Sequence, residues 1–242
     1  YLNGNRIVGI HTNKQDFTTD SIILCTGHSA SDTYETLLAQ GVEITQKDFA
    51  IGVRVEHPQS LIDQSTYGKH YGHPALKASS YQLTAKTSVN RGVYSFCMCP
   101  GGFVIPAATD AEQLVVNGMS PSNRGTAWSN SGMVVELHPE DISSVQSMQD
   151  ISPSSNLCMM EFQKRLEKTC SQQGNMKQTA PAQRMADFVN NRLSYDLPNS
   201  SYAPGLISSP LHFWLPDMIS HRLQEGFDCS RDTYVKSSSY SS

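Results

Sequence analysis

Two polar side chains, Arg54 and His57, follow the apolar run that begins at Phe49. A guanidinium can hold a carboxylate by two parallel hydrogen bonds, and an imidazole titrates near neutral pH and can move a proton. We therefore assign Arg54 and His57 as candidate catalytic residues. A structural ion pair of Arg54 with Glu56 or another acid is the alternative for the arginine, and a purely structural role is the alternative for His57.

The second group with chemical potential surrounds the pair Cys97 and Cys99, which share one side of an extended segment. A redox pair needs an accessible thiol of low pKa, and buried structural cysteines are the alternative. The sequence Pro100-Gly101-Gly102 predicts a tight backbone that lines a pocket. With Asn117 and Ser120, which lie in a turn further along, the two cysteines are candidate substrate-binding residues. A similar polar run, Ser129-Asn130-Ser131, is interpreted as ordinary turn chemistry.

Several segments together resemble a known family. The chain carries Thr26-Gly27-His28 after an apolar run, an unusual stretch from Phe49 to Gln59, and a longer one from Arg91 to Gly102. Shorter motifs continue the likeness: Tyr67-Gly68, Val115 to Ser120, Arg184 to Phe188, and Leu215-Pro216. In this combination the chain, up to about Phe227, resembles a family of FAD-dependent dehydrogenases among the NAD(P)/FAD-dependent oxidoreductases.

The resemblance implies an α/β flavoprotein with two dinucleotide folds, in which a doubly wound FAD-binding domain is interrupted by a substrate-side α+β domain of mixed strands and helices. In such proteins the backbone at the Thr-Gly turn passes close to FAD, and glycine permits that approach. Thr26, Gly27 and His28 are therefore candidate cofactor-binding residues, together with Gly101 and Gly102. An ordinary strand-to-helix turn at Thr26-Gly27 is the alternative.

The chain departs from this family pattern in two respects. It contains no GxGxxG turn to seat a pyrophosphate on a helix N-terminus, and no glycine-rich segment near its C-terminus. We interpret it as an internal fragment whose parent transfers a hydride between FAD and an unknown organic substrate, with NAD(P) as an electron partner. The alternative is a non-catalytic substrate-binding module from a truncated relative.

The candidate residues must be positioned by the helices and strands around them. Residues 1–46 are expected to form a partial FAD-binding domain. Asn3-Gly4 predicts a hairpin turn. The apolar run from Asp20 to Cys25 predicts a strand buried in a parallel sheet. A helix from Ser29 to Gln40 follows, with Ser29 and Asp32 as a capping box and Gly41 as its stop.

Residues 47–215 are expected to form the substrate-side domain, mainly β and then helical. An alternating pattern predicts a strand at residues 49–57, and strand-like runs predict further strands at residues 81–85, 92–97, 103–106, 113–117 and 132–137. Helices are predicted from Leu157 to Gln173, and from a first turn at Pro181 through Phe188. A further helix within residues 216–229 returns toward the cofactor domain and ends at Gly226, and residues 230–242 are expected to be a disordered tail.

Composition excludes several classes of partner. The net charge of −4 offers no attraction for nucleic acid or anionic lipid, and no apolar run is long enough to span a membrane. The expected partner is a small-molecule substrate, while the oligomeric state stays open. Six scattered cysteines favour a soluble intracellular protein, in the cytoplasm or a plastid. A single CxC pair is too few ligands for zinc, so we expect no metal.

Overall fold

The computed structural model describes residues 1–4, 6–27, 29–143, 145, 151–152 and 154–239, without the side chains of residues 230–239. The chain divides into two compact units, residues 1–43 and 44–242, which are described separately below. Helices and open sheets occur together, as the α/β and α+β interpretation of the sequence predicted.

The first unit holds two short hairpins and one helix. Strand β1 (Leu2–Asn3) pairs with β2 (Arg6–Ile7), as the Asn3-Gly4 turn predicted, and β3 (Gly9–His11) pairs with β4 (Asp16–Thr18). Helix α1 (Ser31–Ala39) ends at Gly41, which has a φ of +84°. A left-handed glycine after the last turn lets later N–H groups bond to the last carbonyls, here from Val42 N–H to Leu37 O at 3.0 Å.

Two predictions for this unit are wrong. Residues 21–27 form no strand, and Ile23 is 88% exposed. A buried parallel strand needs a hydrogen-bonded neighbour, and no segment in the described part of the chain pairs with these residues. The predicted capping box is also absent. The N-cap is Ala30 instead of Ser29, and alanine has no polar side chain that could cap the helix.

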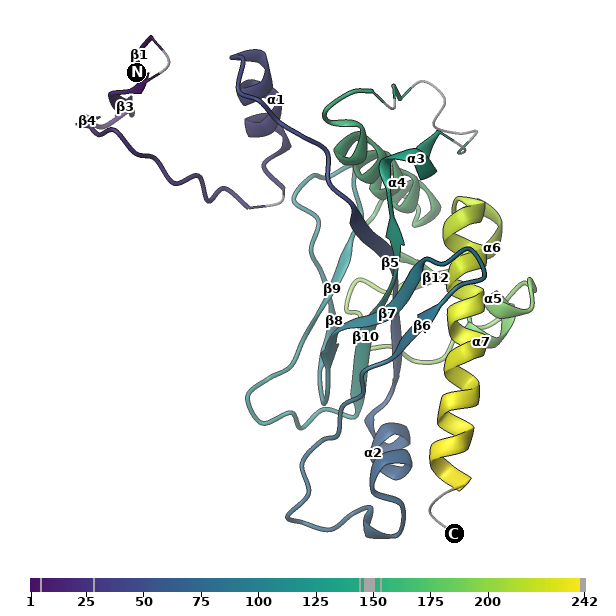
Figure 1. Ribbon diagram of the computed structural model, residues 1–242. Helices are drawn as coiled ribbons and strands as arrows, with labels where there is room; N and C mark the ends of the chain where they lie inside the picture. The colour runs from purple at the N-terminus through teal and green to yellow at the C-terminus, as the bar shows by residue number, and fades with distance from the viewer. Residues whose placement is uncertain (5, 28, 144, 146–150, 153, 240–242) are drawn as a thin grey trace. The chain divides into compact units, whose positions relative to one another are not determined.

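The second unit is built on a four-stranded antiparallel sheet in the order β5-β10-β7-β6 (Figure 1). These strands are β5 (Phe49–Pro58), β10 (Trp128–Leu137), β7 (Gly92–Cys99) and β6 (Thr84–Lys86). A hairpin of β8 (Phe103–Pro106) and β9 (Val116–Met119) forms a second sheet, and β11 (Ala180–Ala182) lies parallel to β12 (Leu206–Ser208).

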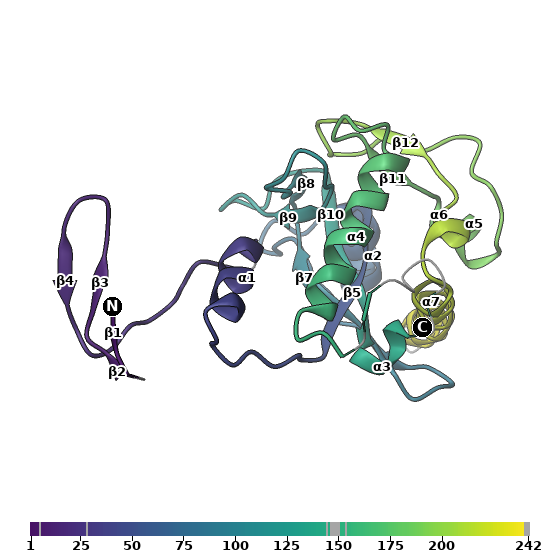
Figure 2. The same ribbon diagram turned by 90° about the horizontal axis from the view of Figure 1, so that it is seen from above.

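Helices cover one face of the four-stranded sheet. Apolar residues that alternate along β7 and β10, including Val93, Val135 and Leu137, pack in one core with Phe162 and Ile219 from two helices. Figure 2 looks nearly along the longest helix, α7, beside this sheet. The helices of the unit are α2 (Gln59–Tyr67), the 3-10 turn η1 (Gly68–His70), α3 (Pro139–Ile142), α4 (Cys158–Gln173), α5 (Met185–Val189), α6 (Leu211–Trp214) and α7 (Asp217–Ser239).

Most predicted elements of this unit form close to the predicted positions, but three differ from the prediction. Pro181 does not open a helix: it lies in β11, opposite Ile207 of the parallel strand β12, where a missing N–H is tolerated at a sheet edge. The strands predicted at residues 81–85 and 113–117 form instead at Thr84–Lys86 and Val116–Met119.

The C-terminal helix also differs from the prediction. Gly226 does not end α7 but lies inside it, where a Cβ would come within 2.4 Å of Val93 Cγ1. Glycine is therefore explained by close helix-to-sheet packing. The backbone stays helical to Ser239, where a disordered tail from residue 230 was predicted. Residues 240–242 lie outside the described part.

None of the helices formed by described residues is both long and apolar enough to cross a membrane.

Candidate functional site

A β-bulge in β7 lies at the centre of the candidate site. Asn130 on β10 pairs with Cys99, whereas Gly132 pairs with Phe96, so β7 has one extra residue in this interval. Within the bulge, Cys97 adopts a φ of +48°, a left-handed conformation that is uncommon for a residue other than glycine. Bulges of this kind re-aim side chains and occur often beside functional sites.

Arg54 gathers the polar groups around this bulge. Its Nη1 donates to Asn130 Oδ1 at 2.6 Å and to the Cys97 carbonyl oxygen at 3.4 Å, and its Nη2 donates to Asn117 Oδ1 at 3.0 Å. The guanidinium of Arg54 on β5 is therefore held by residues of three other strands, β7, β9 and β10. We call the set Arg54, Cys97, Cys99, Asn117 and Asn130 the arginine cluster.

Gly118 makes the close packing of this cluster possible. A Cβ on this residue would lie 2.2 Å from Asn130 Oδ1, 2.4 Å from Arg54 Nη1 and 2.8 Å from Cys99 Sγ. All three distances are shorter than van der Waals contact, so only glycine leaves room for the side chains to meet.

The positive charge of Arg54 has no carboxylate partner in the part of the chain that the structure describes. The ion pair with Glu56 does not form, because Glu56 accepts hydrogen bonds from Ser201, with its N–H at 3.1 Å. Arg54 is half-buried, and its hydrogen bonds to described residues go to neutral groups. A partly desolvated cation without a counter-ion favours the binding of an anion.

A second unmatched group lies beside Arg54. Asn130 is 0% exposed, and its Nδ2 has no hydrogen-bond partner among the described residues. Its Oδ1 is fixed as an acceptor by Arg54, so the amide cannot be turned round without losing that bond. A buried donor without a partner costs about 1–3 kcal/mol, which an arriving acceptor would offset.

The two cysteines of the cluster differ in environment. Cys97 is exposed, whereas Cys99 is buried and its thiol donates to the Cys97 carbonyl oxygen at 3.4 Å. Burial and then the neighbouring Cys97 raise the pKa of the Cys99 thiol, and Arg54 opposes that rise. Cys99 therefore lacks the low pKa that the sequence analysis required of a redox thiol.

His57 lies outside the arginine cluster. It is three residues from Arg54 on a regular strand, so the two side chains leave opposite faces of β5. The His57 ring nitrogens lie 2.8 Å from Ser129 Oγ and 3.0 Å from Tyr81 Oη. Burial lowers the pKa of His57, which favours a neutral ring between two hydroxyl groups. Its catalytic role stays a prediction, and the structure does not join it to Arg54.

Gly101, Gly102 and Ser120 are explained by packing. Gly101 has a φ of +53°, and a Cβ there would lie 1.8 Å from the Arg124 carbonyl oxygen. At Gly102 the nearest atom would be the Met119 carbonyl oxygen at 2.6 Å. The Ser120 hydroxyl donates to the Pro100 carbonyl at 2.8 Å. Their predicted roles toward cofactor or substrate stay predictions, since backbone contacts already account for these residues.

The predicted cofactor-binding turn belongs to the first unit. Thr26 and Gly27 are exposed, Gly27 has a φ of +82°, and a Cβ on it would meet no atom within 4 Å. The backbone conformation, rather than crowding, accounts for glycine at this position. His28 lies outside the described residues.

The residue that sequence reasoning missed is Asn130. The run Ser129-Asn130-Ser131 is not a turn: all three residues are buried within β10. Three consecutive polar residues directly before the apolar half of a strand were the available signal. The burial of Asn130 could not be foreseen from its own strand. It depends on close packing against Gly118 of β9, a strand that is distant in the sequence.

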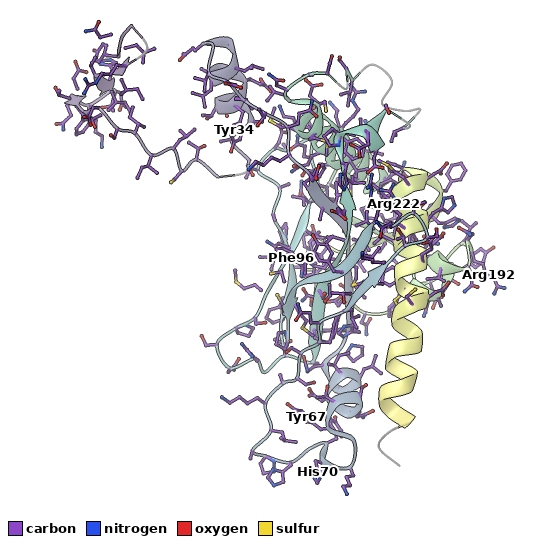
Figure 3. All side chains as sticks on the ribbon, viewed as in Figure 1. Tyr34, Tyr67, His70, Phe96, Arg192 and Arg222 are labelled. Carbon is purple, nitrogen blue, oxygen red and sulfur yellow. The ribbon has the colours of Figure 1, made fainter. Side chains whose placement is uncertain are left out.

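A pocket of about 560 Å³ lies elsewhere in the second unit, beside the Arg184 to Phe188 motif. Figure 3 labels Arg192, one of its lining residues. The charged side chains here are largely matched, because Arg184 pairs with Asp196 and Asp187 accepts from Ser194 at 2.7 Å. No group of three potential metal ligands occurs among the residues described. The arginine cluster is therefore the stronger candidate site.

Comparison with known proteins identifies a family for the second unit. The family described as FAD-dependent protein, C-terminal domain-like, matches residues 48–238, which include the whole arginine cluster. An uncharacterized protein of Clostridium beijerinckii is 41% identical over 224 residues, covering 91% of this chain and 40% of the relative. The chain thus spans about two fifths of the length of that relative. Its second unit belongs to the C-terminal domain-like family of FAD-dependent proteins.

Proposed function

We propose that the chain is the substrate-side part of an FAD-dependent oxidoreductase that transfers a hydride between FAD and an organic acid. The observation that carries this proposal is the half-buried guanidinium of Arg54, which is bonded to three neutral oxygens and to no acid among the described residues. Family membership supports the flavin, and the uncompensated charge supports a carboxylate on the substrate.

The residues present fit part of an FAD site. FAD, when bound, supplies the hydride chemistry, and the protein contributes orientation and electrostatics. Gly27, in the first unit, offers an open backbone that a flat ring could approach. The pyrophosphate has no GxGxxG turn within these 242 residues, so its binding is assigned to other parts of the full-length protein.

Arg54 is suited to bind the substrate carboxylate. A guanidinium has five N–H donors, and the three observed bonds occupy two on Nη1 and one on Nη2. Nε–H and the second Nη2–H remain, and these adjacent donors form an edge that binds a carboxylate through two bonds. Asn117 and Asn130 hold the guanidinium in place, which limits the entropy lost when the substrate binds.

An apolar surface lies beside this charged group. Phe96 is on the side of the sheet away from α7 (Figure 3) and is 62% exposed. It belongs to the same cross-strand row as Arg54, separated from it by Gly132, which has no side chain to fill the gap. We infer that the carbon skeleton of the acid lies on Phe96 while its carboxylate binds Arg54.

The test uses the full-length protein that contains this chain, purified with FAD. Under anaerobic conditions, a panel of organic acids and the methyl esters of the same acids is screened in both directions. In the first series each compound is added to the oxidised flavin, and bleaching of the flavin absorbance reports hydride transfer from the compound. In the second series the flavin is first reduced with one equivalent of NADH or NADPH, and recovery of the absorbance reports hydride transfer to the compound. The proposal predicts that at least one acid exchanges electrons with the flavin and that its ester does not. Equal reaction of acids and esters would refute the carboxylate assignment.

The same experiment separates the alternative function. A non-catalytic binding module would bind the acid through Arg54, seen as a shift of the flavin spectrum or by calorimetry, without any change in the flavin oxidation state.

A further inference from the structure

The bulge in β7 brings two thiols of unequal exposure together. Cys97 and Cys99 are separated by one residue, and the left-handed φ of +48° at Cys97 shortens the chain between them relative to a regular strand. The Cys99 thiol is directed back toward Cys97, since it donates to the Cys97 carbonyl oxygen at 3.4 Å. Cys97 itself is exposed. The accessible thiol therefore lies beside a protected one.

Charge near the pair favours a two-step reaction. Burial is the main cause of the raised pKa of Cys99, the neighbouring Cys97 thiol adds to it, and Arg54 acts in the opposite direction. In a mixed disulfide Cys97 has no ionisable thiol, so the part that Cys97 adds would be lost. Arg54 would remain, so Cys99 would ionise more readily at the moment when its thiolate is needed.

We propose that Cys97 and Cys99 form a reversible dithiol–disulfide pair, with Cys97 as the attacking thiol, Cys99 as the resolving thiol and Arg54 as the positioning residue. The substrate class is a small-molecule disulfide. This activity needs no flavin, so it does not depend on the proposed function.

The exchange balances in two displacements. The Cys97 thiolate attacks one sulfur of R–S–S–R, a mixed disulfide forms, and one R–S⁻ leaves. The Cys99 thiolate then attacks the Cys97 sulfur, which forms the Cys97–Cys99 bond and releases the second R–S⁻. The two protein thiols give up two protons to solvent and two electrons to the small disulfide, which is reduced to two thiolates, R–S⁻.

The experiment uses this chain in a background of Cys25→Ser and Cys229→Ser, which removes the other exposed cysteines. The reduced protein is mixed with 5,5′-dithiobis(2-nitrobenzoate) at less than one equivalent, and thiol release is followed with time. Mass spectrometry of the intact protein and of its peptides locates the products.

With both cysteines present, we expect two equivalents of released thiol per equivalent of reagent and a protein lighter by two hydrogens, with a Cys97–Cys99 bond. Cys99→Ser should release one equivalent and retain the adduct on Cys97. Cys97→Ser should react slowly and form no internal bond. Circular dichroism of both variants verifies that they fold.

Arg54 is tested through the second step. In Arg54→Met the adduct on Cys97 should persist longer, and its resolution should move to higher pH. For each pH unit by which a thiol pKa rises, the rate below that pKa falls about threefold, because lower ionisation is partly offset by greater nucleophilicity. Arg54→Lys should largely restore the rate.

Two results would overturn the proposal. One is a stable adduct on Cys97 in the protein that retains Cys99, because resolution would then not occur. The other is absence of any adduct on Cys97 in the Cys99→Ser variant when the protein is folded. Neither result bears on flavin binding, which is measured separately.

Discussion

Gly118→Ala is the sharpest perturbation of the arginine cluster. The added methyl group would lie 2.2 Å from Asn130 Oδ1 and 2.4 Å from Arg54 Nη1, so the 2.6 Å bond between these atoms must break or lengthen. Loss of a hydrogen bond to a charged group costs about 1.5–3 kcal/mol, and the lower entropy of the unfolded alanine chain returns about 0.4–1 kcal/mol. We expect a net loss of about 0.5–2.5 kcal/mol in the free energy of unfolding.

The matched control is Gly92→Ala on β7. Its Cβ would meet nothing closer than Glu136 Oε2 at 3.6 Å, an ordinary contact, so the lower entropy of the unfolded alanine chain should stabilise this variant by up to about 1 kcal/mol. Urea unfolding of the purified chain gives both free energies, and alkylation of Cys99 reports the local structure. We expect faster alkylation in Gly118→Ala alone. If the two variants were equally stable and equally protected at Cys99, the packing described for the cluster would be wrong.

Three further predictions concern the rest of the molecule. Burial alone would raise the pKa of Asp141, but hydrogen bonds from Arg222 and the His138 N–H lower the pKa to about 2. The ionised carboxylate therefore stabilises the fold above about pH 4, and this stabilisation is lost as the pH falls toward 2. Asp141→Asn should therefore lower the free energy of unfolding by about 2 kcal/mol at pH 7 and by less at pH 2.5. Urea unfolding at the two pH values measures both losses, and equal losses would contradict this role of Asp141. Gly226→Ala should destabilise the protein despite its higher helix propensity, and Val93→Ala should relieve part of that loss in the double variant, whereas additive effects would speak against the helix-to-sheet contact. The chain purified by itself should be colourless, because it lacks the glycine turn that binds a pyrophosphate; a visible spectrum with retained flavin, or one-to-one micromolar binding of FAD, would disprove this.

Elements that are determined by their own residues could be predicted from the sequence, whereas elements that depend on distant contacts could not. Residues 49–57 alternate as a half-buried strand does, and residues 103–106 form a short apolar run, and both strands form where the pattern placed them. The strand expected from Asp20 to Cys25 depends on neighbours that its own residues cannot specify, so it does not form here. Gly226 was misread as a helix end because its cause is a distant contact with Val93.

The candidate site divides in the same way. Arg54, Cys97, Cys99 and Asn117 were recognised from residue type and position, and the structure brings all four together with Asn130. His57 was grouped with Arg54 by proximity in sequence, yet the two-residue period of a strand sends it to the other face. Predicting the role of Asn130 would have required the register of β10 against β7, including the bulge, and no local sequence pattern reveals that register.

The most direct test of the account measures carboxylate binding at Arg54. The full-length protein with bound FAD is titrated with benzoate, and the flavin difference spectrum gives the dissociation constant for the unmodified protein, Arg54→Lys and Arg54→Met. Loss of a two-pronged, charge-assisted contact should weaken binding by about 10- to 100-fold in Arg54→Met, with a smaller effect in Arg54→Lys and unchanged FAD content. Equal benzoate affinity in the unmodified protein and Arg54→Met would contradict the assignment of the arginine cluster as the substrate site.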